Sequence, residues 1–272
     1  MPGATIEGNG DVEISGIAYD SRRVKQSDLF VAVEGLTSDG HAFVSDALAR
    51  GAAAVAVDRD VTLPPGTPLL RMPSTRIGLA EVAAEFYGRP SRKLKVAGIT
   101  GTDGKTTTTH MAEHVLQASG VVAGAMSTVS FTGSGGEMDN LSGQTTMEAP
   151  EIQAWLARMA EAAVECAVIE TTSHALVQER VRACDFDVAA FTNVGHDHLD
   201  YHASWDDYLE AKARLIDLTA GGADKKCHIS AGLSKAAAKV SAGRSGADDE
   251  HAHHSLLPVS YQGDLASGRW TR

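Results

Sequence analysis

Short apolar runs recur through the first 90 residues, separated by segments that carry apolar residues at helical spacing. This pattern is typical of a small α/β unit, because strands and helices that share a core both need an apolar face. Glycine and proline between 88 and 90 end the last of these segments and predict a linker at 88–93. The pattern predicts strands at 14–19, 29–33, 53–57 and 69–72 and helices at 43–50 and 77–87.

From Leu94 onward, apolar runs and helical spacing alternate regularly. Strands separated by helices imply a mostly parallel sheet, with ligands at the carboxyl ends of its strands. We therefore predict an α/β fold in which a small N-terminal domain at 1–90 precedes a mostly parallel-sheet domain at 94–220. The pattern predicts strands at 94–99, 121–126, 165–169 and 187–192, helices at 105–119, 150–163, 175–182 and 204–217, and a Gly/Ser-rich loop at 132–143.

Residues 221–272 show neither period and are rich in Gly, Ser, Ala and Lys. Two interpretations are open: a disordered tail, or sequence outside the fold because the gene is truncated or frame-shifted. His251, His253 and His254 cluster there, but three histidines without a scaffold are more typical of a polar tract than of a metal site. We assign no chemistry to this segment.

Composition narrows the classes of function. The 272 residues are enough for two domains, each with its own core. A net charge of −11 argues against a nucleic-acid or anionic-membrane partner, so local loops must bind any phosphate ligand. Cys166, Cys184 and Cys227 have no zinc or disulfide spacing, which fits a reducing compartment. No apolar run approaches the length of a membrane span, about 20 residues, and no signal-peptide pattern opens the chain, so we expect a cytoplasmic protein.

The strongest chemical signal is a loop that follows an apolar strand and reads Gly-Ile-Thr-Gly-Thr-Asp-Gly-Lys-Thr at 98–106. A buried strand, a glycine-rich loop and a helix together wrap backbone N–H groups around a triphosphate. Lys105 would contact the β- and γ-phosphates, and the Thr106 hydroxyl would bind Mg²⁺. The loop departs from the strict P-loop pattern, because Gly98 comes one residue early and Ile99 occupies the glycine position. The alternative is an ordinary turn between strand and helix, which gives no reason for a Gly-Lys-Thr sequence.

Two further segments with metal-binding residue types follow predicted strands. Glu170 ends one strand and stands where nucleotide-binding sheets hold a second metal ligand, with a strand-capping acid as the alternative. Residues 193–202 contain a dense set of potential ligands, which favours a metal or phosphate site. A metallo-β-lactamase-like hydrolase would need a histidine at Tyr201 and has no phosphate loop, so we set that class aside. The set is His196, Asp197, His198, Asp200 and His202.

Three other segments are ambiguous on spacing alone. Lys212 has Glu210 and Arg214 nearby on a predicted helix, where its side chain would be solvated. The segment Asp20-Ser21-Arg22 would form a turn, and the pair Thr145-Thr146 would cap the helix that starts at 150. Without further information, none of the three carries a functional prediction.

Taken in order, five segments resemble the Mur ligase family over about residues 12–220. The resemblance implies ATP-driven amide-bond formation: ATP phosphorylates a substrate carboxylate, the amine of an amino acid attacks the acyl phosphate, and ADP and phosphate leave. It also implies the substrates, which are ATP, UDP-N-acetylmuramoyl-L-alanyl-D-glutamate and a diamino acid, either meso-diaminopimelate or L-lysine. The segments are Tyr-Asp-Ser-Arg (19–22), Asp-Leu-Phe-Val-Ala-Val (28–33), the loop at 98–109, Glu-Thr-Thr-Ser-His-Ala-Leu (170–176) and Asp-His-Leu-Asp-Tyr-His (197–202).

The resemblance further implies roles for single residues. Thr106 and Glu170 would hold one Mg²⁺, and His198 would help to bind a second Mg²⁺ near the acyl phosphate. Lys212 would carry a carbamate that supports the metals and the γ-phosphate, which makes Lys105, His198 and Lys212 the catalytic residues. The ATP-binding residues would be Gly101, Thr102, Asp103, Gly104, Lys105, Thr106 and Thr107. The UDP-linked substrate would contact Ser21, Leu36, Thr37 and Ser38 in the first domain and Gln144, Thr145, Thr146, Thr172, Gln178 and Arg180 in the second.

The chain departs from the family in three places. Met147 stands where proline is common after the Thr-Thr pair, and Asp103 replaces the commoner asparagine. Nothing after Ala220 resembles the family's C-terminal domain, so we expect a C-terminally truncated ligase. Two other functions stay open: a non-catalytic ATP- or UDP-sugar-binding protein, and a ligase similar to folylpolyglutamate synthetase, against which the segment at 19–22 argues. We expect a monomer with small-molecule substrates, no nucleic-acid partner and no membrane insertion.

Overall fold

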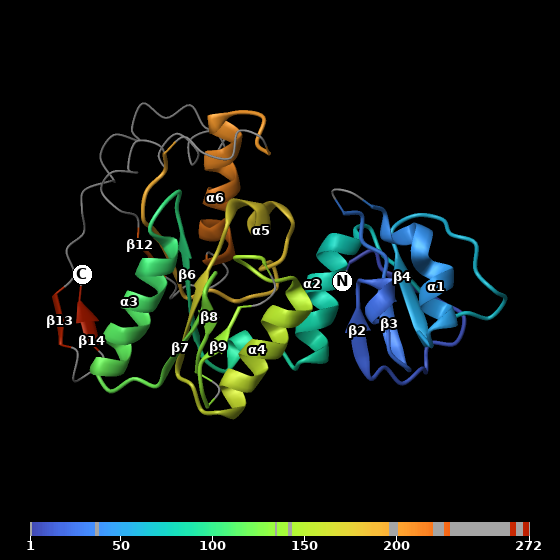
Figure 1. Cartoon of the computed structure of the whole chain (residues 1–272), viewed down its shortest axis with the longest axis horizontal. Helices are drawn as coiled ribbons and strands as arrows, with labels where there is room; N and C mark the ends of the chain where they lie inside the picture. Colours follow the sequence, from blue (N-terminus) through green and yellow to red (C-terminus); the bar gives the residue numbers. More distant parts are fainter. Residues whose placement is uncertain are drawn as a thin grey trace.

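The computed structural model describes residues 2–35, 38–133, 135–140, 143–195 and 201–219, and the backbone of short strands at 226–228, 262–264 and 269–271. Figure 1 shows two larger sheets, each with helices packed against it. Most neighbouring strands in both sheets run parallel. The predicted α/β class is therefore confirmed for both sheets.

The first sheet contains β1 (Thr5–Glu7), β2 (Gly16–Ala18), β3 (Asp28–Val31), β4 (Ala54–Val57) and β5 (Leu69–Arg71) in the order β1-β5-β4-β3-β2. It is parallel except for β1, which runs antiparallel to β5. Helices α1 (Val44–Ala49) and α2 (Thr75–Phe86) cover its two faces: Phe30 packs in the cluster under α1, and Val31 in the cluster under α2. Every residue of β3 and β4 is buried, because these central parallel strands have a helix on each side.

The second sheet has the order β12-β11-β6-β10-β7-β8-β9, parallel from β12 to β7 and antiparallel over its last two pairs. In the part of the chain that the structure describes, no helix is long and apolar enough to span a membrane. The strands are β6 (Lys95–Thr100), β7 (Ala123–Met126), β8 (Ser130–Phe131), β9 (Met138–Asp139), β10 (Cys166–Glu170), β11 (Val188–Phe191) and β12 (Lys226–His228). The helices are α3 (Lys105–Ala118), α4 (Ala149–Glu161), α5 (Ser173–Val177) and α6 (Trp205–Thr219), and β13 (Gln262–Asp264) pairs separately with β14 (Arg269–Thr271).

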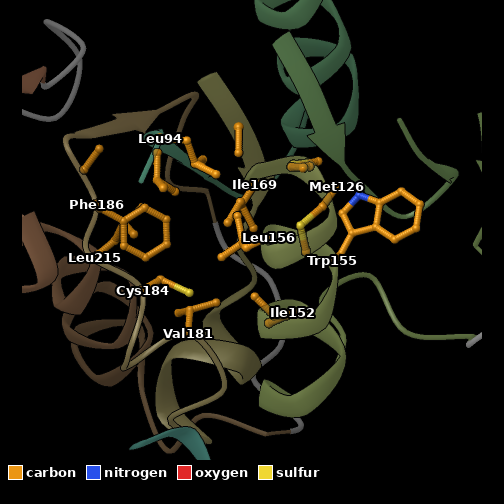
Figure 2. Close-up of a cluster of buried hydrophobic side chains, with 14 of the residues drawn as sticks. Leu94, Met126, Ile152, Trp155, Leu156, Ile169, Val181, Cys184, Phe186 and Leu215 are labelled. Atoms are coloured by element: carbon orange, nitrogen blue, oxygen red, sulfur yellow. The ribbon is translucent and has the colours of Figure 1, made fainter. Parts of the chain in front are cut away.

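The core of the second sheet explains one glycine of the motif. Leu156 of α4 packs in the same cluster as Ile169 of β10, Phe186 and Leu215 of α6 (Figure 2). A Cβ on Gly98 would lie 2.8 Å from Leu215 Cδ1 and 2.9 Å from Phe186 Cε1. Gly98 therefore lets α6 and Phe186 pack closely on β6, and it lies within the strand rather than in the loop that follows.

The structure differs from the predicted elements in short stretches. β1 was not predicted, because its three residues include one apolar side chain and so show no strand pattern. All three residues are exposed in the structure. β9 lies within the predicted loop 132–143, where it pairs antiparallel with β8. Helix α5 ends at Val177 instead of continuing to 182, because Glu179 adopts a left-handed φ of 59°. β12 falls in the segment 221–272, most of which lies outside the described residues.

Helices α2 and α4 lie against each other and join the two parts of the molecule (Figure 1). Ala80 and Ala84 of α2 form a small apolar cluster with Ala149 at the start of α4. Beside this cluster, the Tyr19 hydroxyl donates to Glu151 Oε1 at 2.8 Å. The predicted linker at 88–93 contains a turn of 3₁₀-helix, Pro90–Arg92.

Candidate functional site

The loop between β6 and α3 turns sharply at Gly101, which has a φ of 152°. A Cβ at this position would lie 1.8 Å from Thr192 Oγ1, so the turn requires glycine. Gly104 is the N-cap of α3, has a φ of 76°, and a Cβ there would meet nothing within 4 Å. The first N–H groups of a helix have no partner within the helix, so the start of α3 offers them to an anionic ligand.

Residues after β11 brace this loop. The Asn193 side-chain oxygen accepts from the backbone N–H groups of Thr102 and Asp103, both at 2.9 Å. The Thr192 hydroxyl donates to the Asp103 carbonyl at 2.6 Å, and the Thr102 hydroxyl lies 3.0 Å from the Tyr208 hydroxyl. These contacts fix the loop's conformation and orient two of its N–H groups toward Asn193.

Glu170 connects the loop to the neighbouring strand. It ends β10, which pairs in parallel with β6, and it is 2% exposed. The Thr106 hydroxyl lies 3.0 and 2.9 Å from the two carboxylate oxygens. Thr128, which follows β7, donates its N–H at 2.9 Å and its hydroxyl at 3.1 Å to Glu170 Oε2. One carboxylate and two hydroxyls therefore gather at the carboxyl ends of three adjacent strands.

Two lysines bind carbonyl groups of the same loop. Lys105 Nζ donates to the Thr102 carbonyl at 2.8 Å, and Lys212 Nζ donates to the Gly101 carbonyl at 2.7 Å. Lys212 is 1% exposed, and its Nζ lies 4.4 Å from the centre of the Tyr208 ring. The interpretation of Lys212 as a solvated helix residue, which spacing alone favours, is therefore wrong.

A second polar group adjoins Glu170 through Thr146. The Thr146 hydroxyl donates to the Glu170 carbonyl at 2.9 Å and accepts from the Thr172 N–H at 3.2 Å. Arg180 Nη1 donates to the Thr146 carbonyl at 2.7 Å, and its Nη2 donates to Gln178 Oε1 at 2.8 Å. The structure thus brings these four predicted substrate residues next to the predicted metal ligand.

The segment around Thr145 and Thr146 does not cap a helix as predicted. The predicted cap of α4 by Thr145-Thr146 is wrong, because the N-cap is Glu148 and no side chain caps this helix. Thr172 instead caps α5, accepting from the Ala175 N–H at 3.1 Å. The Gln144 carbonyl accepts from Asn140 Nδ2 at 2.8 Å, and Thr145 is half-buried beside it.

The first sheet carries a separate recess of about 550 Å³. Ser21, Arg22, Ser38 and Arg76 line it together with Glu148 from the second part of the chain. Ser21 is 8% exposed and begins a 3₁₀ turn whose N-cap, Asp20, accepts from the Arg22 N–H. The predicted contacts Leu36 and Thr37 lie outside the described residues.

The histidine-rich segment is described in part. His196, Asp197, His198 and Asp200 lie outside the described residues, as do the tail histidines. His202 is 3% exposed, with Nε2 3.0 Å from Ser173 Oγ and Nδ1 3.3 Å from Asp207. Among the described residues, no group of three or more His, Cys, Asp or Glu side chains could hold a metal ion.

Sequence reasoning missed the roles of Asn193, Thr128 and Glu148. Asn193 and Thr128 each follow a strand of the parallel sheet, so the rule that places ligands at carboxyl ends could have found them. Glu148 carries no such signal, because both of its arginine partners are distant in sequence.

Two family models match the chain. The Mur ligase middle domain matches residues 99–241, and the model described as Mur ligase family, catalytic domain, matches residues 13–87. The first match covers more than half of the 272 residues and extends past Ala220, where the sequence pattern loses its period. Together the two matches include every predicted site residue.

Individual relatives match over the same region. The UDP-N-acetylmuramyl-tripeptide synthetase of Roseiflexus sp. (strain RS-1) is 48% identical over 213 residues, 76% of this chain and 42% of the relative. A UDP-N-acetylmuramoyl-L-alanyl-D-glutamate–2,6-diaminopimelate ligase of Syntrophomonas wolfei is 44% identical over 212 residues, 78% of this chain and 43% of the relative. A solved ligase of the latter name aligns with a TM-score of 0.68 at 26% identity, covering 85% of this chain and 46% of that one. The chain spans less than half the length of these relatives.

Proposed function

The chain belongs to the Mur ligase family, and on that premise we propose that it carries the UDP-substrate and ATP-binding parts of a peptidoglycan-precursor ligase. The proposed reaction adds a diamino acid to UDP-N-acetylmuramoyl-L-alanyl-D-glutamate with conversion of ATP to ADP. Relatives at 48% and 44% identity bear the names of a muramyl-tripeptide synthetase and a diaminopimelate ligase. The domain division at 1–90 and 94–220 and a monomeric, cytoplasmic protein are parts of this proposal.

One observation carries the proposal: Thr106, Glu170 and Thr146 form a continuous hydrogen-bonded group at the carboxyl ends of β6 and β10. The Thr106 hydroxyl and the Glu170 carboxylate are hard oxygen donors of the kind that Mg²⁺ prefers, so the residues fit this ion. When bound, Mg²⁺ would neutralise charge on the phosphates of ATP. We assign Thr106, Glu170, His198 and a carbamate on Lys212 to metal binding.

The ATP phosphates would bind at the start of α3. The first N–H groups of this helix have no partner within it, and Lys105 would exchange the Thr102 carbonyl for phosphate oxygens. This assigns ATP to Gly101, Thr102, Asp103, Gly104, Lys105, Thr106 and Thr107. The side chain of Asn193 holds the loop in shape, so little reorganisation is needed when ATP binds.

The UDP-linked substrate would span the recess and the Thr146 group. Ser21 and Ser38, with Leu36 and Thr37, would contact its uridine end. Its peptide end would then reach Thr146, Thr172, Gln178 and Arg180, with Gln144 and Thr145 beside them. A guanidinium suits a carboxylate because it can donate two parallel hydrogen bonds.

The proposed chemistry has two steps. A carboxylate oxygen of the substrate attacks the γ-phosphorus of ATP, the bond to the β-phosphate oxygen breaks, and ADP leaves. The amine of the diamino acid then attacks the acyl carbon, a C–N bond forms, and phosphate leaves with the C–O bonding electrons while the amine loses a proton. Positioning and charge neutralisation account for most catalysis of this kind, which fits the preformed contacts of Glu170 and Lys212.

An ADP-release assay on this chain, extended at its C-terminus to the full length of its relatives, tests the proposal. We expect ADP formation that requires both UDP-N-acetylmuramoyl-L-alanyl-D-glutamate and a diamino acid. ADP formation with a folate substrate and glutamate instead would reject it in favour of a folylpolyglutamate synthetase. The same assay on this 272-residue chain, where binding without turnover is the expected result, separates a binding fragment from an active ligase.

A further inference from the structure

Glu148 lies between two arginines from different parts of the chain. Arg76 of α2 donates through Nη1 to Glu148 Oε2 at 3.3 Å. Arg180, which follows α5, places Nη2 3.0 Å from Glu148 Oε1. The side chains of Glu148 and Arg180 are 10% and 11% exposed, and that of Arg76 is 24% exposed. The contact therefore crosses the junction of α2 and α4 in a largely buried setting (Figure 1).

The helix that Glu148 precedes does not use its carboxylate. Glu148 is the N-cap of α4, a position where a side-chain oxygen normally accepts from the first turn's N–H groups. No such bond forms here. Pro150 also lies at the helix start and has no N–H to offer. Both carboxylate oxygens are directed to arginines instead, so stabilisation of α4 does not account for this side chain.

The charges within the group formed by Arg76, Glu148 and Arg180 do not balance. Two guanidinium groups share one carboxylate, which leaves one positive charge in excess at the edge of the recess. Arg180 Nε is buried and has no hydrogen-bond partner among the described residues. Buried groups of this kind are normally paired, so the arrangement suits an anionic group on a ligand.

Glu148 also connects the two places where we propose that the UDP-linked substrate binds. On one side, Arg76 lines the recess and donates to the Glu34 carbonyl at 3.1 Å. On the other side, Arg180 donates to the Thr146 carbonyl, and the Thr146 hydroxyl donates to the Glu170 carbonyl. A carboxylate between Arg76 and Arg180 therefore fixes the distance between the recess and the end of β10.

We propose that Glu148 is a positioning residue, which orients Arg180 and Arg76 together so that one acidic, UDP-linked ligand can contact both parts of the chain. The inference rests on the proposed function, since it assumes that a ligand of this class binds. UDP alone reaches the recess only, whereas the muramyl-dipeptide portion needs Arg180 as well.

Calorimetric titration of the 272-residue chain tests this claim with three probes: UDP, UDP-N-acetylmuramoyl-L-alanyl-D-glutamate, and Mg²⁺ with ATP. We expect Glu148→Gln to weaken the muramyl-dipeptide ligand by about 10- to 100-fold, the range for losing hydrogen bonds between charged groups. Its affinity for ATP should stay within about twofold of the unmodified chain, and its affinity for UDP should fall by less than its affinity for the muramyl-dipeptide ligand, because UDP contacts the recess but not Arg180. Glu161→Gln removes an exposed carboxylate at the other end of α4 and should change none of the three.

A double-mutant cycle separates positioning from general damage. If Glu148 acts through Arg180, Arg180→Ala and the Glu148→Gln/Arg180→Ala double variant should bind the muramyl-dipeptide ligand equally weakly. Additive losses would overturn the inference. An equal loss of UDP and muramyl-dipeptide affinity in Glu148→Gln would also overturn it, because that result indicates a disturbed fold.

The outcomes distinguish this inference from the proposed function. Failure of the unmodified chain to bind the muramyl-dipeptide ligand would reject the proposed function itself. Normal binding by the unmodified chain and an undiminished affinity in Glu148→Gln would reject the inference alone. If Glu148→Gln does not fold, Arg76→Lys gives the same test from the more exposed partner, since a lysine keeps the charge but cannot reproduce the forked contacts. We expect the same selective loss there, and unchanged muramyl-dipeptide binding would contradict the inference.

Discussion

The two sheets differ in how their candidate sites treat polar side chains. At the end of the second sheet, Glu170 and Lys212 are 2% and 1% exposed and fully engaged with the chain. At the recess of the first sheet, Arg22 is 83% exposed, although Ser21 is nearly buried. Burial of charge costs free energy unless hydrogen bonds compensate. The polar side chains at the second sheet are therefore fixed before a ligand arrives, whereas the recess of the first sheet is an open surface. Under the proposed function, the fixed region would serve phosphate chemistry and the open region would serve substrate recognition.

The largest expected difference concerns glycines. Gly101→Ala would force a Cβ against Thr192 Oγ1 at a positive φ, and we expect it to reduce the free energy of unfolding by about 3–5 kcal/mol. Gly66, which precedes β5 of the first sheet, also has a positive φ but open space around it. Gly66→Ala should therefore lower the free energy of unfolding by only about 1–2 kcal/mol. Urea unfolding of both variants measures the difference. Equal costs would show that the loop is not held rigidly against Thr192.

Glu170→Gln tests the carboxylate of the fixed site. Glutamine can still accept from Thr106 but lacks the charge that would bind Mg²⁺. We expect Mg²⁺-dependent affinity for ATP to fall by about 100-fold, equivalent to about 2.8 kcal/mol, in calorimetric titrations with and without the metal. UDP binding should not change, and a parallel loss of UDP affinity would contradict the division between the two regions.

Lys212→Met tests the buried amine. Methionine fills a similar volume but leaves the Gly101 carbonyl without this donor, and we expect a loss of about 1–2 kcal/mol in the free energy of unfolding. Lys95 forms an ion pair with Asp187 and is 76% exposed, so Lys95→Met should change stability by less than about 0.5 kcal/mol. Thermal unfolding compares the two. An equally small effect at Lys212 would show that the loop does not depend on it.

The smallest predicted effect lies at the junction of the two regions. Burial raises the pKa of Glu151 above its ordinary value of 4.5, and the hydrogen bond from Tyr19 opposes that shift. The folded state then holds the proton more tightly than the unfolded state, so this group's contribution to stability is full below pH 4.5 and is lost as pH rises through the raised pKa.

In Glu151→Gln, the side chain at this position is neutral at every pH, so the variant does not lose this contribution to stability as pH rises. Thermal unfolding at about pH 4 and about pH 7 should show the unmodified chain losing stability relative to the variant as pH rises. Carboxylates with lowered pKa values, such as Asp20 and Asp58, are present in both proteins and cancel in the difference. A difference that is the same at both pH values would contradict the raised pKa.

The sequence predicted those features of the fold and site that depend on neighbours along the chain. The strand, glycines and Lys-Thr pair at 95–106 and the acid at the end of β10 are local patterns, and the sheet places them together as the strand-end rule requires. The role of Gly98 was not local: it follows from Phe186 and Leu215, which no spacing pattern connects to it.

Long-range burial accounts for the rest of what sequence could not show. The sequence neighbours of Lys212 are charged, but the loop that buries its amine lies 111 residues away. Glu148 resembles an ordinary first-turn acid, and its partners come from α2 and from the turn after α5. Helical spacing describes one element at a time, so it cannot identify a charge that is held between two elements.

We propose that this chain has two separate ligand sites, a fixed one for Mg²⁺ with ATP and an open one for the UDP-linked substrate. Sequential calorimetric titration tests it most directly: UDP-N-acetylmuramoyl-L-alanyl-D-glutamate is added first, then ATP with Mg²⁺ to the saturated chain. We expect one binding event for each ligand, with the second weakened about 100-fold by Glu170→Gln and the first retained. Competition between the two ligands, or binding of neither to the folded chain, would contradict it.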